Sequence, residues 1–355
     1  MTERRACEIK QAPLVSICVT AHNYAQYLPA CLESLFQQSH EPTECIVVDD
    51  GSTDGTDRIL ERYRGRIQVV RHETPLGQLA SIISAFRCTR GQFVCFVDAD
   101  DLVYRDYVSV NVAAHLSAET YAAVSTSLQD IIDAEDHGLG TYPVRVFRPL
   151  LRLPEGSFRE RVIDCPGTGP VPVMLYDPQA NYAFQWLWGT MSSMTFRRDA
   201  LALVLSVEPN GFQICADAYL AQFCHALGGT VMIERALGAY RRHGRNNFAD
   251  NVLVGGLAPL SARSDHKNDP RPMIASHIAA HQQELCRAIG IRRFVPLIEK
   301  FCPLPDALAI LFKRENGFGV RMYTWFLTLW LARNLRILVF RATRVMAILR
   351  FSETP

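Results

Sequence analysis

Short apolar runs alternate with segments of helical periodicity over the first third of the chain. The apolar, β-branched runs are typical of buried strands and cover residues 14–19, 45–48, 67–70 and 93–97. The segments in which apolar side chains recur at helical spacing cover residues 28–36, 56–63 and 79–88. Short strands that alternate with helices predict βαβ units with right-handed crossovers and a largely parallel α/β sheet.

The remainder of the chain has a different composition. Residues 128–185 are rich in Pro and Gly, which predicts long loops over the sheet. These loops could form a lid over a bound substrate. Residues 255–272 have a similar composition and indicate a linker to a helical tail. We therefore expect an α/β domain over 1–250, a linker over 251–272 and a helical, amphipathic region over 273–355.

Composition and charge narrow the classes of function. The chain has 355 residues, of which 48% are hydrophobic, enough for a sizeable buried core. Its net charge of +1 gives no reason to expect a nucleic-acid partner. The eleven cysteines are scattered without a Cys-x-x-Cys pair, which argues against a disulfide framework and a zinc site and favours a reducing compartment. Residues 1–11 carry charges and no apolar run, so we expect no secretory signal and a cytoplasmic location.

The chemistry is expected where the parallel strands end. In sheets of this kind, ligands bind beyond the carboxyl ends of the strands. Three predicted strands end in small or acidic residues, namely Thr20-Ala21-His22-Asn23, Asp49-Asp50 and Asp98-Ala99-Asp100-Asp101. Because parallel strands present these ends at one edge of the sheet, the three polar segments should lie close together.

Asp98 and Asp100 have the spacing of ligands to a hard divalent cation. Oxygen ligands on a short turn suit Mg²⁺ or Mn²⁺, with diphosphate oxygens and water completing the shell. Such an ion would stabilise the charge on a departing nucleotide diphosphate. The adjacent acids Asp49 and Asp50 can accept hydrogen bonds from a nucleobase edge and a ribose. For both segments the alternative is a plain turn that caps a helix.

Residues 15–101 resemble the inverting family-2 glycosyltransferases of GT-A fold. The Val-Ser-Ile-Cys-Val-Thr-Ala-His-Asn opening, the Val-Val-Asp-Asp-Gly-Ser-Thr-Asp turn and the Val-Asp-Ala-Asp-Asp turn match in the family's order and approximate spacing. The resemblance implies a Rossmann-like, mostly parallel sheet flanked by helices. The chain also lacks both the Gly-x-Gly-x-x-Gly motif after a strand and the P-loop motif, which argues against dinucleotide-binding and P-loop folds.

The resemblance implies roles for particular residues. Thr20 and Asp50 would contact the nucleoside, Asp98 and Asp100 would bind ribose, diphosphate or metal, and Asp101 would line the same site. We expect nucleotide-sugar contacts at Thr20, Ala21, His22, Asn23, Asp49, Asp50, Asp98, Ala99, Asp100, Arg241 and Arg242. We expect the metal ligands among Asp98, Asp100, Asp101 and His243.

The family also implies a catalytic base, an Asp at the start of a downstream helix. Asp217 fits, because an apolar helical stripe follows it at Leu220, Phe223, Cys224 and Leu227. One carboxylate would take the proton of the acceptor hydroxyl as that hydroxyl attacks the anomeric carbon, with inversion. The alternative is an Asp favoured by the helix dipole, which would lower its pKa.

Two further segments carry candidate contacts. Residues 240–247 resemble the family's Arg-x-His-x-x-Asn loop, which implies that His243 is a metal or diphosphate ligand and that Arg241, Arg242 and Arg245 steady the diphosphate; a structural or solvated histidine is the alternative. Trp186 and Trp188 could stack on an acceptor sugar, although ordinary packing of a strand face explains them equally well.

The chain departs from the family in three places. Ser81-Ile82-Ile83 replaces the basic or amide residue that many relatives carry on the helix after Gly77, and Ala216 replaces the usual Glu before the base. The Gln-x-x-Arg-Trp element of processive synthases is absent, which favours transfer of one sugar per encounter.

The C-terminal tail is basic. Six arginines and no acidic residue lie between Arg321 and Arg350, and the uncharged run 322–332 is too short to cross a bilayer. An apolar helical face at Leu338, Ala342, Val345 and Leu349 predicts a helix on an anionic membrane surface. The alternative is packing on the catalytic domain or on a dimer partner.

Together these observations predict a metal-dependent enzyme that moves one hexose-type sugar, from a UDP-sugar by family resemblance, to a glycan or lipid-linked acceptor. We expect it in the cytoplasm, peripheral to the cytoplasmic face of the membrane. A sugar-nucleotide nucleotidyltransferase is an alternative, although residues 20–23 lack the Gly-rich loop with Arg or Lys that such enzymes carry. A non-catalytic nucleotide-sugar-binding module is another.

Overall fold

The computed structural model describes residues 12–117, 121–141, 158–178, 188–206, 216–244, 246, 269–312 and 324–331. The chain divides into two compact units, Met1–Asp269 and Pro270–Pro355. The finer division into a domain over 1–250, a linker over 251–272 and a tail stays a prediction, because most of the linker lies outside the described residues.

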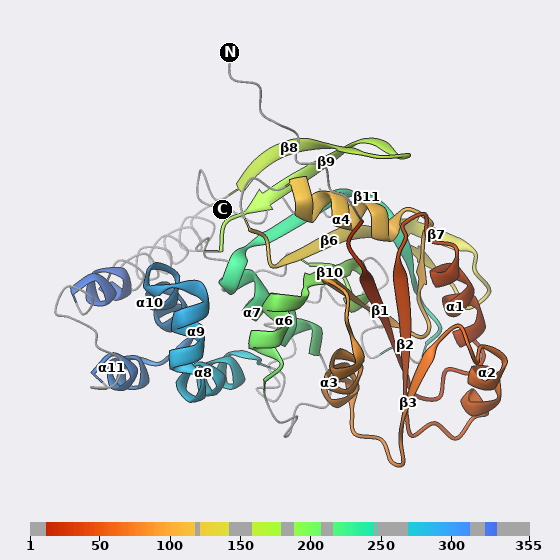
Figure 1. The fold of residues 1–355 in the computed structure, drawn as a ribbon, viewed down its shortest axis with the longest axis horizontal. Coiled ribbons are helices and arrows are strands. Elements are labelled where there is room, and N and C mark those ends of the chain that lie inside the picture. The colour runs from red at the N-terminus through yellow and green to blue at the C-terminus, as the bar shows by residue number, and fades with distance from the viewer. Residues whose placement is uncertain are drawn as a thin grey trace, which may run out of the picture. The chain divides into compact units, whose positions relative to one another are not determined.

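Eleven strands of the described residues form one sheet in the first unit (Figure 1). They are β1 (Val15–Ala21), β2 (Thr43–Asp50), β3 (Gln68–His72), β4 (Phe93–Asp98), β5 (Leu102–Val103), β6 (Val124–Ile132), β7 (Gly138–Thr141), β8 (Phe158–Cys165), β9 (Gly169–Tyr176), β10 (Met194–Arg197) and β11 (Thr230–Arg241). The order is β3-β2-β1-β4-β10-β6-β11-β9-β8, with β5 on β11 and β7 on β6. Strands β3, β2, β1 and β4 are parallel, β10 runs against both of its neighbours, and β6 and β11 are again parallel.

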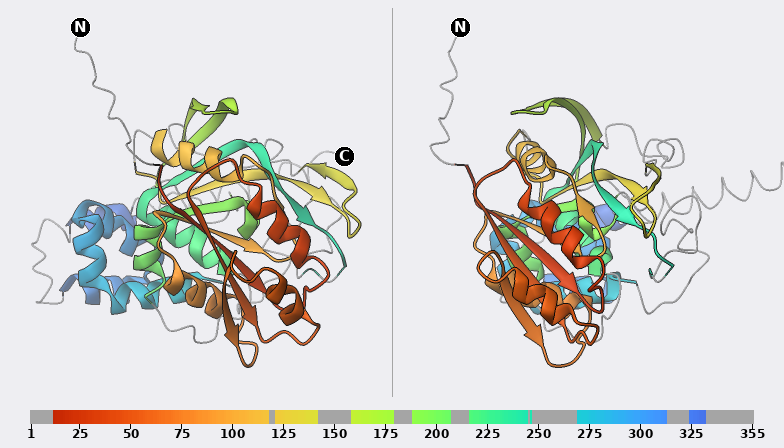
Figure 2. Two further views of the ribbon diagram at one scale, coloured as in Figure 1. Left: turned by 45° about the vertical axis from the view of Figure 1, so that its right-hand side comes forward. Right: turned by 90° about the vertical axis from the view of Figure 1, so that its right-hand side faces the viewer.

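Helices flank this sheet, as the sequence predicts. In the first unit they are α1 (Leu28–Phe36), α2 (Thr56–Arg62), α3 (Gln78–Cys88), α4 (Tyr107–Ser117), η1 (Met191–Ser193), α6 (Arg198–Val204) and α7 (Ala216–Gly228). Figures 1 and 2 show α1 and α2 on one side of β1–β3 and α3 on the other. Because β1 is covered on both faces, nearly all of its side chains are buried. The predicted mixed, mostly parallel α/β sheet is confirmed.

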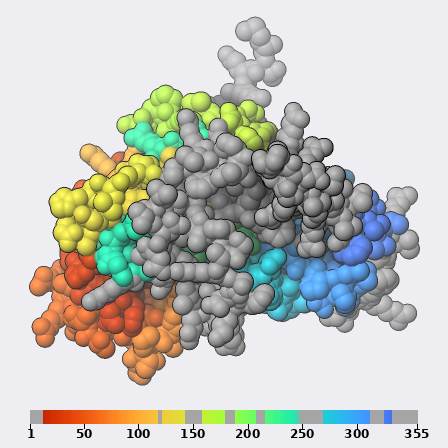
Figure 3. All heavy atoms as spheres, turned by 180° about the vertical axis from the view of Figure 1, so that it is seen from behind, coloured from red at the N-terminus to blue at the C-terminus, as the bar shows by residue number. Residues whose placement is uncertain are grey.

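One expectation about the fold is wrong. Residues 128–185 were expected to form long loops, yet they include most of β6 and all of β7, β8 and β9. The glycines Gly167 and Gly169 have positive φ and make the turn of the β8–β9 hairpin. Pro170 and Pro172 lie in the part of β9 that pairs with β8 alone, since β11 reaches only as far as Val173. A proline is tolerated where one side of a strand needs no N–H donor. Figure 3 shows the hairpin and β7 at the surface, as light-green and yellow atoms.

The turn after β2 depends on Gly51. Its φ is +68°, and a Cβ there would lie 2.8 Å from backbone atoms of Thr74 and Pro75. We expect Gly51→Ala to lower the free energy of unfolding in urea by at least about 1 kcal/mol more than Gly65→Ala. Gly65 is a matched control, because its φ is +92° but a Cβ would meet nothing within 4 Å. Equal losses in the two variants would show that the close approach to Pro75 is unimportant.

The second unit is helical. It contains α8 (Arg271–Ala280), α9 (Gln282–Ile289), α10 (Ile291–Phe301) and α11 (Leu304–Phe312), and residues 324–331 are also helical. Ile274, Ile278, Leu285, Phe294 and Ile298 are fully buried within it. Among the helices of the described segments, none combines the length and apolar character needed to span a bilayer. The predicted apolar face from Leu338 to Leu349 lies outside the described residues.

Candidate active site

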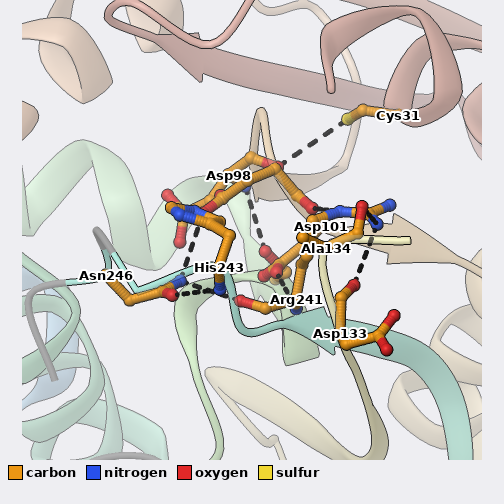
Figure 4. A network of polar contacts seen from close by, with 10 residues as sticks. Cys31, Asp98, Asp101, Asp133, Ala134, Arg241, His243 and Asn246 are labelled. Atoms are coloured by element: carbon orange, nitrogen blue, oxygen red, sulfur yellow. Dashed lines mark hydrogen bonds and ion pairs between the residues drawn. The ribbon is translucent and has the colours of Figure 1, made fainter. Parts of the chain in front are cut away.

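The acidic turn after β4 meets the segment that follows β11. The Asp100 carboxylate contacts the imidazole Nε2 of His243 at 2.9 Å, and the Asn246 amide donates to the same oxygen at 3.4 Å. Figure 4 shows His243 and Asn246 directed toward this turn. Tyr27 stacks on the His243 ring with centroids 5.0 Å apart, and Tyr24 meets it edge-on. The structure thus brings together Asp100 and His243, which are 143 residues apart in sequence.

The pKa of Asp98 is raised by its surroundings. Burial, followed by repulsion from the nearby carboxylates of Asp100 and Asp217, raises its pKa to about 7, against hydrogen bonds from Gln78 and Thr20 that lower it. The effect of Asp217 shows that the proposed base shares the electrostatic environment of the acidic turn. A cation among these carboxylates would relieve their repulsion.

Asp101 has a different position from the other two. Its side chain is fully buried, and it accepts the backbone N–H of Arg241 at 3.0 Å. Burial, followed by repulsion from Asp100 and Asp98, raises its pKa well above the ordinary range. The contact with Arg241 joins the turn to β11, and the predicted role of Asp101 as a metal ligand stays a prediction.

Asp217 lies in the first turn of α7, as the sequence predicts. Its carboxylate accepts the N–H of Ala218 at 2.8 Å. Burial raises the pKa of Asp217 to about 6, and the backbone hydrogen bonds only partly oppose this. The donors at the helix N-terminus act in the expected direction, but the net shift of the pKa is upward because desolvation outweighs them. A carboxylate with this pKa is ionised at neutral pH and more basic than an exposed aspartate.

Gln78 is a site residue that the sequence reasoning missed. Its amide Nε2 donates to Asp98 Oδ1 at 3.3 Å, and its Oε1 accepts the N–H of Ala216 at 3.2 Å. An amide on the helix after Gly77 is thus present, one residue beyond that glycine rather than at Ser81-Ile82-Ile83. Its place at the first position of α3 was the available signal.

The ends of β1 and β2 hold each other in place. His22 Nδ1 lies 2.7 Å from the carbonyl of Asp50. Asn23 has a φ of +60°. Its side-chain oxygen accepts a hydrogen bond from the Thr53 N–H at 2.8 Å, and its own backbone N–H donates to the Ser52 hydroxyl at 3.0 Å. His22 and Asn23 therefore fix the turn after β2, and their predicted contact with the nucleotide sugar stays a prediction, as does that of Ala21 and Ala99.

Asp50 is bound by several protein donors. Its Oδ1 accepts the Leu76 N–H at 2.9 Å and lies 2.6 Å from His72 Nδ1, while Oδ2 accepts the Gly77 N–H at 2.8 Å. Burial alone would raise its pKa, but these hydrogen bonds prevail and lower it. The carboxylate is therefore ionised and held in one orientation. Asp49 accepts the Ser52 N–H at 3.0 Å. This hydrogen bond is typical of a plain turn, which is the alternative to a nucleotide contact at this residue.

Arg241 is buried beside the acidic turn. Its side chain is 1% exposed, and the guanidinium donates to the carbonyls of Asp100 at 2.8 Å and Asp133 at 3.2 Å. It also pairs with Asp136 at 2.6 Å and lies over the Tyr27 ring. These contacts favour a structural role for Arg241, and its predicted contact with the diphosphate stays a prediction. The role of Arg242 stays a prediction, and Arg245 lies outside the described residues.

This structural role gives a test. We expect Arg241→Met to lower the free energy of unfolding in urea by at least about 2 kcal/mol, because the carbonyls of Asp100, which is buried, and Asp133, which is partly buried, lose their donor. Arg235→Met is the control, since Arg235 makes a partly exposed pair with Asp106 at 2.9 Å and should cost less than about 1 kcal/mol. A fully stable Arg241→Met variant with weakened nucleotide binding would restore the ligand role.

Trp188 is also internal. Its side chain is 3% exposed, its indole N–H donates to the Thr230 hydroxyl at 3.1 Å, and its ring meets His225 edge-on. This geometry favours packing over the predicted stacking on an acceptor sugar. Trp186 lies outside the described residues.

A second group of candidate metal ligands lies in the turn between β6 and β7. Ligand atoms of Asp133, Glu135 and His137 lie within 4.8 Å of one another. The Asp133 carboxylate accepts the N–H groups of Glu135 at 3.0 Å and His137 at 2.8 Å, which is the hydrogen bonding of a tight turn. The sequence reasoning did not single out this group.

Comparison with known proteins agrees with the fold and the acidic turn. Residues 16–166 match the family model described as glycosyl transferase family 2. This part of the chain, which contains β1 to β4 and the acidic turn, is therefore similar to glycosyltransferase family 2. The family-2 match confirms the resemblance seen in the sequence and, at the level of the family, the prediction of a transferase.

Individual relatives cover different parts of the chain. An uncharacterized glycosyltransferase of Nostoc sp. is 26% identical over 66% of this chain and 66% of its own length. An uncharacterized glycosyltransferase of Haemophilus influenzae is 30% identical over 36% of this chain and 40% of its own. The chain thus spans less than two thirds of these relatives. Among solved structures, S. aureus TarS 1–349 in complex with UDP-GlcNAc is 15% identical, with a TM-score of 0.47, over 86% of this chain and 93% of that one.

Proposed function

We propose that this chain is a glycosyltransferase that moves a single sugar from a nucleotide-diphosphate sugar, a UDP-sugar in the first instance, to a glycan or lipid-linked acceptor. The observation that supports it most is the contact of His243 with Asp100, whose carboxylate, like that of Asp217, acts on the nearby Asp98. This arrangement supports a site for the sugar donor with a general base next to it. That is the requirement for a one-step displacement with inversion.

Mn²⁺ or Mg²⁺ is the proposed cofactor. Two carboxylates and an imidazole, from Asp98, Asp100 and His243, are ligands that either ion accepts. Burial contributes most to the raised pKa of Asp98, and the remaining contribution is repulsion from Asp100 and Asp217, which a divalent cation would reduce. When bound, the ion would neutralise charge on the leaving diphosphate.

The base is proposed to be Asp217. With a pKa of about 6, it is ionised at neutral pH and can take the proton of the acceptor hydroxyl as that hydroxyl attacks the anomeric carbon. Asp50, held ionised and oriented by the Leu76 and Gly77 N–H groups, can accept a hydrogen bond from the nucleoside. Attack from the face opposite the diphosphate would invert the configuration.

A donor screen tests the proposal. Isothermal titration with UDP-GlcNAc, UDP-glucose, UDP-galactose and GDP-mannose, with and without Mn²⁺, should reveal binding that the ion strengthens. Release of the nucleoside diphosphate in the presence of candidate acceptors should follow. Release of inorganic diphosphate would instead indicate a nucleotidyltransferase, and binding without any turnover would indicate a non-catalytic module.

We also propose that the basic C-terminal tail associates with an anionic membrane surface. The support is the charge pattern of residues 321–350, with six arginines and no acid. Truncation after Gly317 should release the protein from vesicles that contain anionic lipid, measured by flotation. If the truncated chain floats as the full chain does, the tail is not the anchor.

A further inference from the structure

Gln78 joins two parts of the proposed site that come from distant segments of the chain. Its Nε2 donates to the Asp98 carboxylate, which ends β4, and its Oε1 accepts the N–H of Ala216, the first residue of α7. These partners are 20 and 138 residues away in sequence. Ala216 directly precedes Asp217. The Gln78 amide therefore links Asp98, the carboxylate proposed to bind the sugar donor, to the start of the helix that carries the proposed base.

The chemistry of the glutamine suits both contacts. An amide offers a donor and an acceptor at the same end of one side chain. The donor meets a carboxylate, and the acceptor meets an N–H in the first turn of a helix, which has no partner within the helix. Glutamate would keep only the acceptor, and methionine would keep neither.

Gly77, the residue before Gln78, is held by two hydrogen bonds. The N–H of Gly77 donates to Asp50 Oδ2 at 2.8 Å, and the Ser81 hydroxyl bonds the Gly77 carbonyl at 3.1 Å. The start of α3 is therefore tied to the end of β2. Through Gln78 the ends of β2 and β4 and the start of α7 form one hydrogen-bonded unit.

We propose that Gln78 is a positioning residue that sets the place of the base Asp217 relative to the donor carboxylate Asp98. This proposal rests on the function proposed above. Gln78 itself takes no part in the chemistry. A shift of about 1 Å between reacting groups can lower turnover by about 10²-fold. The contact to Ala216 should therefore govern turnover, and the contact to Asp98 should govern donor binding.

Two variants separate these contacts. We expect Gln78→Met to lower kcat by about 10²-fold, while the affinity for UDP with Mn²⁺ changes by less than about tenfold, the value of one hydrogen bond. Gln78→Glu keeps an acceptor for the Ala216 N–H, so its kcat should exceed that of Gln78→Met. Its affinity for UDP should nevertheless be lower than that of Gln78→Met, because a new carboxylate faces Asp98.

Gln38→Met is the matched control. Gln38 also bridges separate elements, donating to the carbonyls of Ser34 and Tyr104 and accepting the N–H of Val108. It should lower the Tm without changing kcat or UDP affinity. The proposal is wrong if Gln78→Met keeps wild-type kcat, or if kcat and UDP affinity fall by the same factor in both Gln78 variants. If the wild type neither binds UDP nor releases a nucleoside diphosphate from any sugar of the screen, the proposed function fails instead.

Discussion

Asp217→Asn lowers kcat by about 10²–10⁴-fold, the usual contribution of a general base, and leaves the affinity for UDP with Mn²⁺ unchanged. The amide has the shape of the carboxylate but cannot take a proton from the acceptor hydroxyl. Turnover is measured as nucleoside diphosphate release, and binding by titration calorimetry. Because burial disfavours the ionised carboxylate, as its raised pKa shows, the neutral variant should unfold at no lower a temperature than the wild type.

Asp199→Asn is the matched control for this prediction. Asp199 occupies the first turn of α6 and accepts the N–H of the next residue, Ala200, at 2.8 Å, as Asp217 does with Ala218 in α7. This control should keep its turnover. A loss of activity in both variants would show that helix capping, and not proton transfer, explains the effect.

The pH dependence of kcat follows from the same group. Asp217 acts only when it is ionised, so the ionised fraction rises with pH up to its pKa of about 6 and is nearly complete above it. We expect kcat to fall by about tenfold for each pH unit below 6 and to level off above. In Asp217→Asn the residual rate should lose this acid limb. If the limb persists in the variant, another group is responsible for it.

Asp100→Ala should have the second large effect, a loss of about 10³-fold in kcat together with the loss of stimulation by Mn²⁺. Asp100 is the carboxylate that His243 and Asn246 contact, so its removal takes away the centre of the proposed ligand set. Turnover is measured over a range of Mn²⁺ concentrations. Asp130→Ala removes a carboxylate that bonds Tyr104 and Thr141, and it should keep the metal dependence.

Full activity of Asp100→Ala without added metal would remove this residue from the mechanism. If the variant loses activity but still responds to Mn²⁺ as the wild type does, Asp100 orders the turn and the ion binds elsewhere. The turn at Asp133, Glu135 and His137 would then be the next candidate.

The features that the sequence predicts well are local. Buried parallel strands such as β1 and β4 are recognised as continuous apolar runs, and the acids that follow them must lie at their carboxyl ends. The stripe after Asp217 likewise fixes the start of α7. Residues 128–185 were misread because composition counts prolines and glycines but does not show which side of a strand pairs.

The features that the sequence does not predict depend on contacts across long separations. Gln78 accepts a hydrogen bond from Ala216, and Arg241 donates to the carbonyls of Asp100 and Asp133. These partners are distant in sequence, so the residues next to Gln78 and Arg241 do not reveal them. The pKa of Asp217 is a similar case. The helix dipole is a local property and lowers the pKa, whereas burial depends on the whole fold and raises it.

The most direct test of the central claim is a titration of UDP into the wild type with and without Mn²⁺. Because Asp98, Asp100 and His243 are proposed to hold an ion that also binds the diphosphate, Mn²⁺ should strengthen UDP binding by tenfold or more, about 1.4 kcal/mol. The same gain should be absent in Asp100→Ala. An affinity for UDP that Mn²⁺ leaves unchanged in the wild type would contradict a metal-dependent nucleotide-sugar site at this edge of the sheet.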